Sequence, residues 1–160
     1  MKKEKVNDLK GIRKPELYKQ AYSRWSNIHW RVEHDPNYSG VTICTDWYIF
    51  SQFYKWYAEN YSEGWQIDKD ILGGNEYSPN NCIFVPCEVN LLYRDVKTSI
   101  QKGVVKNNKG YQAQITIGGI NQKLGTFETI EDASRAYETA RTERIKALSV
   151  QYPQLKSIIK

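Results

Sequence analysis

Apolar and aromatic residues recur at intervals of three and four along the first third of the chain. This spacing predicts a helix over residues 15–31, with Pro15 in its first turn. Turn-forming residues fill 34–40, and residues 41–44 are short and β-prone. A second helix is expected after a cap at Thr45 or Asp46. Its aromatic face comprises Trp47, Phe50, Phe53, Tyr54 and Tyr57. Such a face is more typical of a buried core than of a surface that stacks on bases.

In the middle of the chain the pattern changes from helical spacing to alternation. Apolar and polar residues alternate over residues 64–72, as they do in a half-buried strand. Residues 73–80 are rich in Gly and Asn and predict a loop. Residues 82–85 predict a second short strand, and Pro86 begins a helical stretch that runs through Leu92. The expected order in this region is therefore strand, loop, strand, helix.

Alternation returns after Gly103 and predicts a pair of strands. The first of them has an apolar face that comprises Tyr111, Ala113, Ile115 and Ile117. Its other face is polar and comprises Gln112, Gln114 and Thr116. Gly118-Gly119 predicts a hairpin turn with positive φ, and residues 120–124 predict the returning strand.

A final helix is expected over about residues 130–149, capped by Thr129 together with Asp132. One face of this helix is expected to comprise Ala133, Ala136, Tyr137, Ala140, Arg144 and Ala147. The small alanines would let the helix lie close against a sheet. Strands and helices grouped in separate regions indicate an α+β fold.

The chain has 160 residues, enough for one compact domain or two small ones. It contains no run of about 18 apolar residues, the length that a membrane-spanning helix needs. The charged start, residues 1–5, leads into no apolar signal-peptide core. We therefore expect a cytoplasmic protein with no membrane partner.

Cysteines Cys44, Cys82 and Cys87 are odd in number and lack the C-x-x-C spacing of zinc ribbons. Buried free thiols are the favoured interpretation. A zinc site that combines them with His29 or His34 is the alternative.

The distribution of charged residues along the chain is more informative than the net charge of +5. Residues 1–14 carry six cations against two carboxylates, and residues 94–123 carry six against one. Between them, residues 59–90 carry six carboxylates and a single cation, Lys69. The basic segments favour a polyanionic partner. The acidic segment would repel DNA unless a divalent cation neutralised it, and the alternative is a solvated acidic face.

Three motifs in the acidic segment are Trp65-Gln-Ile-Asp-Lys-Asp-Ile, Tyr77-Ser-Pro-Asn-Asn-Cys and Phe84-Val-Pro with Asn90. Together they resemble the strand-loop-strand-helix core of the HNH, or ββα-metal, endonucleases. Upstream, Tyr38-Ser-Gly-Val and Asp46-Trp-Tyr-Ile-Phe are similar to the pattern of phage members of that family. The resemblance covers residues 17–93. It implies a homing-endonuclease-like enzyme that hydrolyses phosphodiester bonds in duplex DNA.

The resemblance also implies roles for individual residues. Asp68 and Asn90 match the ligands of one divalent metal, and oxygen ligands suit Mg²⁺ or Mn²⁺. Asn81 matches the loop residue that orients the general base. The position of the base itself is occupied by Lys69, whereas the family has histidine. A lysine is ordinarily charged at neutral pH and cannot accept a proton from water.

Three alternatives follow from this departure. Asp70 acts as the base or as a second metal ligand; Lys69 acts after its surroundings make it neutral; or cleavage is lost and the fold and DNA contact are kept. A further alternative takes Asp68 and Asp70 as solvent-facing residues on the same side of a strand.

Residues 103–117, followed by Lys123-Leu-Gly-Thr-Phe-Glu-Thr-Ile-Glu-Asp-Ala-Ser-Arg-Ala-Tyr, resemble the ethylene-response (apetala)-type DNA-binding domain. This likeness implies a three-stranded antiparallel sheet laid on one helix, with the exposed face of the sheet in the major groove of double-stranded DNA. The implied DNA-binding residues are Lys106, Lys109, Gln112, Gln114, Thr116, Gln122 and Lys123. The lysines would contact phosphate and the glutamines would read adenine. The alternative is a small α+β domain with a solvated polar sheet face.

The expected organisation is a basic N-terminal arm (1–14), an HNH-like nuclease region (15–95), a linker (96–102), the ethylene-response (apetala)-type domain (103–152) and a basic tail (153–160). The expected function is metal-dependent cleavage of duplex DNA by a phage-type endonuclease. The alternative is a catalytically inactive HNH-like protein that binds DNA or another protein as a regulator or inhibitor.

Overall fold

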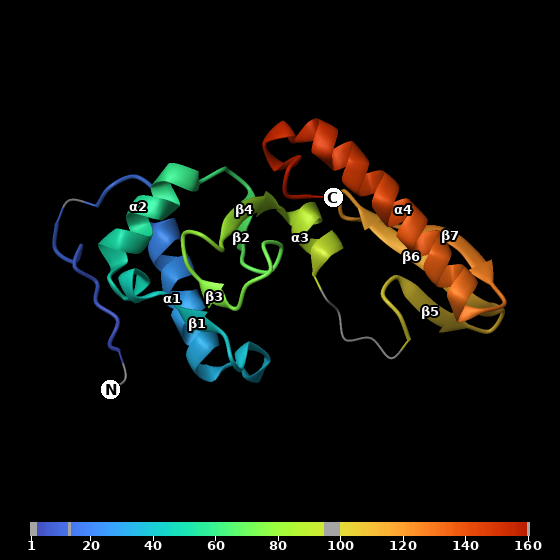
Figure 1. Ribbon diagram of the computed structural model, residues 1–160, viewed down its shortest axis with the longest axis horizontal. Coiled ribbons are helices and arrows are strands. Elements are labelled where there is room, and N and C mark those ends of the chain that lie inside the picture. The colour runs from blue at the N-terminus through green and yellow to red at the C-terminus, as the bar shows by residue number, and fades with distance from the viewer. Residues whose placement is uncertain (1–2, 13, 95–99, 160) are drawn as a thin grey trace. The chain divides into compact units, whose positions relative to one another are not determined.

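The computed structural model describes residues 3–12, 14–94 and 100–159. Residues 1–2 and 13 of the expected N-terminal arm, residue 95 of the expected nuclease region, residues 96–99 of the expected linker and residue 160 of the expected tail lie outside the described residues. The chain forms two compact units, residues 1–84 and residues 85–160. Both combine helices with strands, which confirms the α+β class (Figure 1).

The first unit is built on two helices, α1 (Tyr18–His34) and α2 (Phe50–Asn60). Their apolar faces form one aromatic core, as the helical spacing predicted. The fully buried residues of these helices are Ala21, Trp25, Phe50 and Phe53, and Trp47 of the preceding 3-10 helix (Thr45–Tyr48) packs with them. The indole N–H of Trp25 donates to the main-chain oxygen of Trp47 at 2.6 Å, so the largest buried ring also has its polar atom satisfied.

Short strands complete the first unit. β1 (Thr42–Ile43) pairs in parallel with β3 (Glu76–Tyr77). β2 (Trp65–Asp68) shares a second two-stranded sheet with β4 (Ile83–Pro86), the strand in which the boundary between the units falls. α3 (Cys87–Tyr93) follows β4, so the expected order of strand, loop, strand and helix is present along the chain.

Four local predictions about the first unit were wrong. The second helix begins at Phe50, after a separate 3-10 helix (Thr45–Tyr48), rather than after a cap at Thr45 or Asp46. α1 begins at Tyr18 rather than at Pro15, because Leu17 adopts the left-handed conformation (φ 64°) and ends any earlier helical turn. The predicted loop 73–80 contains β3. The predicted strand 64–72 ends at Asp68, so Asp68 and Asp70 are not neighbours on one strand face.

The expected N-terminal arm lies along the first unit where the structure describes it. Val6 forms a bridge with Ile49, and its N–H donates to the main-chain oxygen of Tyr48 at 2.8 Å. Asp8 accepts a hydrogen bond from the N–H of Ser51 at 2.9 Å, which satisfies a donor in the first turn of α2. This segment is therefore part of the folded unit.

The second unit contains an antiparallel sheet in the order β5-β6-β7, covered on one face by α4 (Figure 1). The strands are β5 (Val104–Asn107), β6 (Gly110–Ile117) and β7 (Ile120–Phe127), and the helix is α4 (Ile130–Gln151). Gly118 and Gly119 form the predicted hairpin turn with φ of 58° and 81°. Thr129 caps α4 by accepting from the N–H of Asp132 at 3.1 Å, also as predicted.

The core of the second unit lies between the sheet and α4, where Val104, Ala113 and Ala133 are buried. Gly103 is required beside it: its φ is 75°, and a Cβ there would lie 2.0 Å from the ring of Tyr137. The predicted helix face was wrong at one position, because Ile145 and Leu148 are buried near the end of α4 and Ala147 is exposed.

Candidate metal site and nucleic-acid interface

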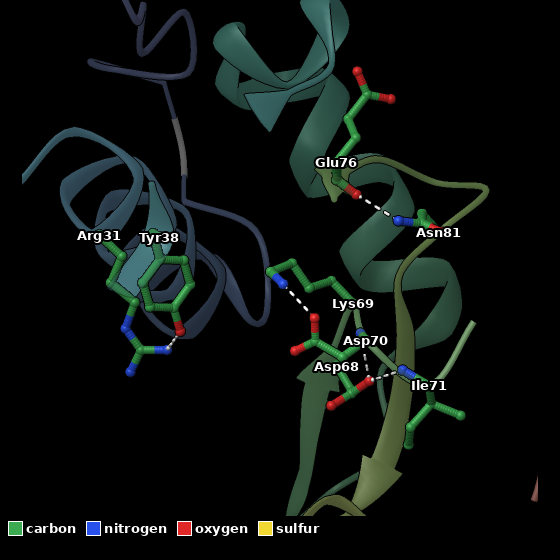
Figure 2. A network of polar contacts seen from close by, with 8 residues as sticks. All are labelled: Arg31, Tyr38, Asp68, Lys69, Asp70, Ile71, Glu76 and Asn81. Carbon is green, nitrogen blue, oxygen red and sulfur yellow. Dashed lines mark hydrogen bonds and ion pairs between the residues drawn. The ribbon is translucent and has the colours of Figure 1, made fainter. Parts of the chain in front are cut away.

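Asp68 is the last residue of β2, and only 8% of it is exposed. Its Oδ1 accepts hydrogen bonds from the main-chain N–H groups of Asp70 and Ile71, both at 2.8 Å (Figure 2). Burial raises the pKa of this carboxyl, and the two N–H groups oppose that shift. Asp68 thus ends the strand by capping a turn. It is also a desolvated carboxylate at the position that the HNH resemblance gives to a metal ligand.

Lys69 is nearly buried and contacts a carboxylate and two aromatic rings. Its side chain is 10% exposed, and Nζ forms an ion pair with Asp70 (Figure 2). Nζ also lies 5.8 Å from the ring centre of Tyr38 and 5.9 Å from that of Tyr77. Nζ therefore lies between a carboxylate and two aromatic rings. Participation of Lys69 in proton transfer stays a prediction.

The two tyrosines beside Lys69 were not predicted as site residues. Their rings stack at 6.5 Å between centres, with 11° between their planes. Arg31 donates from Nη1 to the hydroxyl of Tyr38 at 3.1 Å (Figure 2). Burial raises the pKa of Tyr77, so its hydroxyl stays neutral. The parallel pairing of β1 with β3 positions Tyr77, and no local sequence pattern predicted this pairing.

Asn81 holds a loop together. Its Nδ2 donates to the main-chain oxygen of Glu76 at 2.9 Å, and Figure 2 shows the amide turned toward that oxygen. The same amide covers Gly74, where a Cβ would lie 1.9 Å from Nδ2. A role for Asn81 in orienting a general base stays a prediction.

Asn90, the other expected metal ligand, lies on α3 in the second unit, whereas Asp68 belongs to the first. α3 is fixed to α4 by Arg144, which donates from Nε and Nη2 to the two carboxylate oxygens of Glu88 at 2.5 and 2.8 Å. Arg141 donates from Nε to the main-chain oxygen of Leu92 at 2.9 Å. Joint metal binding by Asp68 and Asn90 stays a prediction.

The zinc alternative gains no support. Among the residues that the structure describes, no group of three or more His, Cys, Asp or Glu residues could hold a metal ion. His29 is buried, with Nε2 3.0 Å from the main-chain oxygen of Trp47, and burial lowers its pKa. The expectation of buried free thiols is confirmed for Cys82, where burial raises the pKa of the thiol to about 12. It was wrong for Cys87, which is exposed, and Cys44 is only partly buried.

The strand register divides the expected DNA-binding residues between two faces of the β5-β6-β7 sheet. Residues directly opposite each other in an antiparallel pair project to the same face. Ala113 and Ile115 are buried, so their face of β6 is the covered one. The opposite face, which we call the open face, carries Gln112, Gln114, Thr116 and Lys123. Lys123 stands opposite Gln114, and the Gln112 amide donates to the Gln114 side-chain oxygen at 3.3 Å.

The other three expected residues lie elsewhere. Lys106 stands opposite Tyr111, and Gln122 opposite Ile115, so both project from the covered face. Lys109 lies in the β5-β6 turn, where its N–H donates to Oδ1 of Asn107 at 2.9 Å. DNA contact by each of the three stays a prediction.

Sequence reasoning missed two residues of β7 that belong to the open face. Asn121 stands opposite Thr116, and Thr126 stands opposite Gln112. Both are exposed. The register of β7 would have identified them, but it contains a bulge opposite Ala113 and Gln114 that simple alternation cannot predict.

A scan against protein-family models and searches of the curated proteins and of the solved structures found no match to this chain. The HNH and ethylene-response (apetala)-type resemblances therefore stay predictions. Among the helices of the described residues, none combines the length and apolar character needed to cross a membrane.

Proposed function

We propose that this chain binds double-stranded DNA through the open face of the β5-β6-β7 sheet. The observation that carries the proposal is the register, which groups Gln112, Gln114, Thr116 and Lys123 on the face opposite α4. Two-stranded ribbons of this size fit the major groove of B-form DNA. There, glutamine amides pair with adenine edges, and lysine contacts phosphate.

The test is binding of the full-length chain to labelled duplex DNA at several salt concentrations. Lys123→Ala is expected to weaken binding to all sequences and to reduce the salt slope by about 0.9, the value for one phosphate contact. Gln114→Ala is expected to cost about 1–3 kcal/mol of discrimination at one base pair. Lys146→Ala, an exposed change on α4, is the control. Unchanged binding by both sheet variants would refute the proposal.

A second proposal is metal-dependent phosphodiester hydrolysis at Asp68, as the HNH resemblance implies. The observation in its favour is a buried carboxylate that a bound cation would neutralise. Asp68 and Asn90 would hold Mg²⁺ or Mn²⁺, which would stabilise the charge that develops on the phosphoryl and leaving-group oxygens. Lys69 would then attract the phosphate, and Asp70 would act as the base or as a second metal ligand.

Plasmid nicking with Mg²⁺ or Mn²⁺ separates cleavage from the inactive alternative. Nicking that Asp68→Asn and Asn90→Ala both abolish would support the metal site, because the asparagine at position 68 keeps an oxygen that can cap the turn. Absence of nicking by the unaltered chain, with activity gained in Lys69→His, would support a protein that has lost its base and acts by binding.

A further inference from the structure

A cavity of about 510 Å³ lies beside the N-terminal segment and the start of α1. Its lining comprises Asn7, Lys10, Lys14, Tyr18, Lys19 and Tyr22. All six belong to the first unit, so the described lining shares no residue with the open face of the sheet. Its volume falls within the range of sites that take small ligands or parts of larger ones.

The charge in this cavity is positive. Three of the lining residues are lysines, and none is acidic. Among the described residues, none of these lysines forms an ion pair with a carboxylate. Asp8, the nearest acidic residue to Lys10 in the sequence, is committed to the N–H of Ser51. The three ammonium groups therefore present a concentrated positive charge to an anion.

Aromatic rings form another part of the lining. The rings of Tyr18 and Tyr22 stack nearly in parallel, with centres 6.1 Å apart and 8° between the planes. Tyr18 is buried and fixed, because its hydroxyl accepts a hydrogen bond from Nδ2 of Asn7 at 3.0 Å. Tyr22 is 38% exposed and presents aromatic surface beside the lysines. The rings of Phe50 and Tyr22 pack edge to face, with their centres 5.4 Å apart.

We infer that this cavity binds a nucleotide unit of single-stranded DNA, with the phosphate near the lysines and the base on the exposed surface of Tyr22. Lysines that track phosphate and an aromatic ring that stacks on a base are the two elements of sequence-tolerant single-strand binding. The sheet plays no part in this contact, so the inference stands or falls independently of the proposed duplex binding.

The experiment measures binding of the full-length chain to a fluorescent oligothymidylate by anisotropy, at several salt concentrations. Lys14→Gln and Lys19→Gln are each expected to reduce the salt slope by about 0.7, the value for one phosphate of a single strand. Tyr22→Leu is expected to weaken binding at least about fivefold, because leucine has no π face for stacking. Lys55→Gln, an exposed change on α2 outside the cavity, is the matched control and should bind as the unaltered chain does.

Competitors identify which part of the nucleotide is recognised. Thymidine monophosphate should displace the oligothymidylate at lower concentration than inorganic phosphate does. Equal competition by the two would overturn the base contact. A monophosphate that binds as tightly as the oligothymidylate would overturn the assignment to a DNA strand in favour of a free nucleotide.

Two further results distinguish failure of this site from failure of the proposed duplex binding. Lys123→Ala should leave oligothymidylate binding unchanged, and Lys19→Gln should leave discrimination among duplex sequences unchanged. If Lys14→Gln and Lys19→Gln bind the oligothymidylate like the unaltered chain, the inference is wrong whatever the sheet does. The two lysines are exposed, so this result does not depend on whether Tyr22→Leu folds.

Discussion

Replacing Arg144 with glutamine should destabilise the second unit by about 2 kcal/mol. Two charge-assisted hydrogen bonds join Arg144 to Glu88, and the side chains are only 24% and 18% exposed. Exposed ion pairs contribute about 0–1 kcal/mol, whereas breaking a buried pair costs about 3–5 kcal/mol. The partial burial places this pair between those limits. For a unit of this size, the loss should lower the midpoint of thermal unfolding by about 8–16 °C.

The chain offers its own internal reference for this measurement. All five tryptophans belong to the first unit, namely Trp25, Trp30, Trp47, Trp56 and Trp65. Tryptophan fluorescence therefore follows the first unit, while amide hydrogen exchange along α4 follows the second. Arg144→Gln should accelerate exchange along α4.

The matched control is Arg135→Gln. Arg135 lies 3.5 Å from Asp132 on the same helix, with the two side chains 76% and 48% exposed, so its loss should cost less than about 0.5 kcal/mol. The Arg144 effect should also depend on pH. Arg144 lowers the pKa of Glu88 in the folded state, so the pair stabilises above the ordinary glutamate pKa and is lost as the pH falls through the folded value. A variant within 0.5 kcal/mol of the unaltered chain at neutral pH would refute this reasoning.

Three other predictions follow from the described contacts. Asp68→Ala leaves the N–H groups of Asp70 and Ile71 without their acceptor and should cost about 1–3 kcal/mol in urea unfolding, whereas Asp68→Asn should cost less. Gly103→Ala should destabilise the second unit by more than about 1 kcal/mol, measured by hydrogen exchange, because Cβ would meet the ring of Tyr137. Burial raises the pKa of Cys82 to about 12, so iodoacetamide at pH 8 should label exposed Cys87 well before Cys82. Peptide mass spectrometry measures the labelling of each cysteine, and equal labelling would contradict the burial of Cys82.

Local patterns predicted much of the fold. Helical spacing identified the cores of α1 and α2, and alternation together with Gly118-Gly119 identified the hairpin of β6 and β7. These features depend on residues close together in sequence. The end of β2 escaped prediction because the expected strand was extended to the apolar residues Ile71 and Leu72, whereas the Asp68 carboxylate turns the chain at once. A side-chain hydrogen bond to the main chain overrode the apolar pattern.

The surroundings of Lys69 could not be predicted in the same way. The resemblance identified Lys69 as the unusual residue, but Tyr38 and Tyr77 reach it through contacts between distant parts of the chain. Lys123 and Gln122 project from opposite faces of the sheet, and which residue lies on which face likewise depends on the pairing of β7 with β6 and on the bulge in β7. The residue types in the sequence indicated the candidate chemistry. Pairing between segments distant in sequence decided which of the candidate residues share a surface.

The contacts between α3 and α4 affect where the gene can be divided to produce the sheet and α4 as a separate fragment. A fragment that starts at Gly103 would contain the whole sheet and α4 but would leave out Glu88 and the Leu92 carbonyl that Arg144 and Arg141 contact. A fragment that starts at Val85 keeps both acceptors. Exchange of this module between proteins, by recombination or by design, should therefore succeed more often when the short helix before it travels with it.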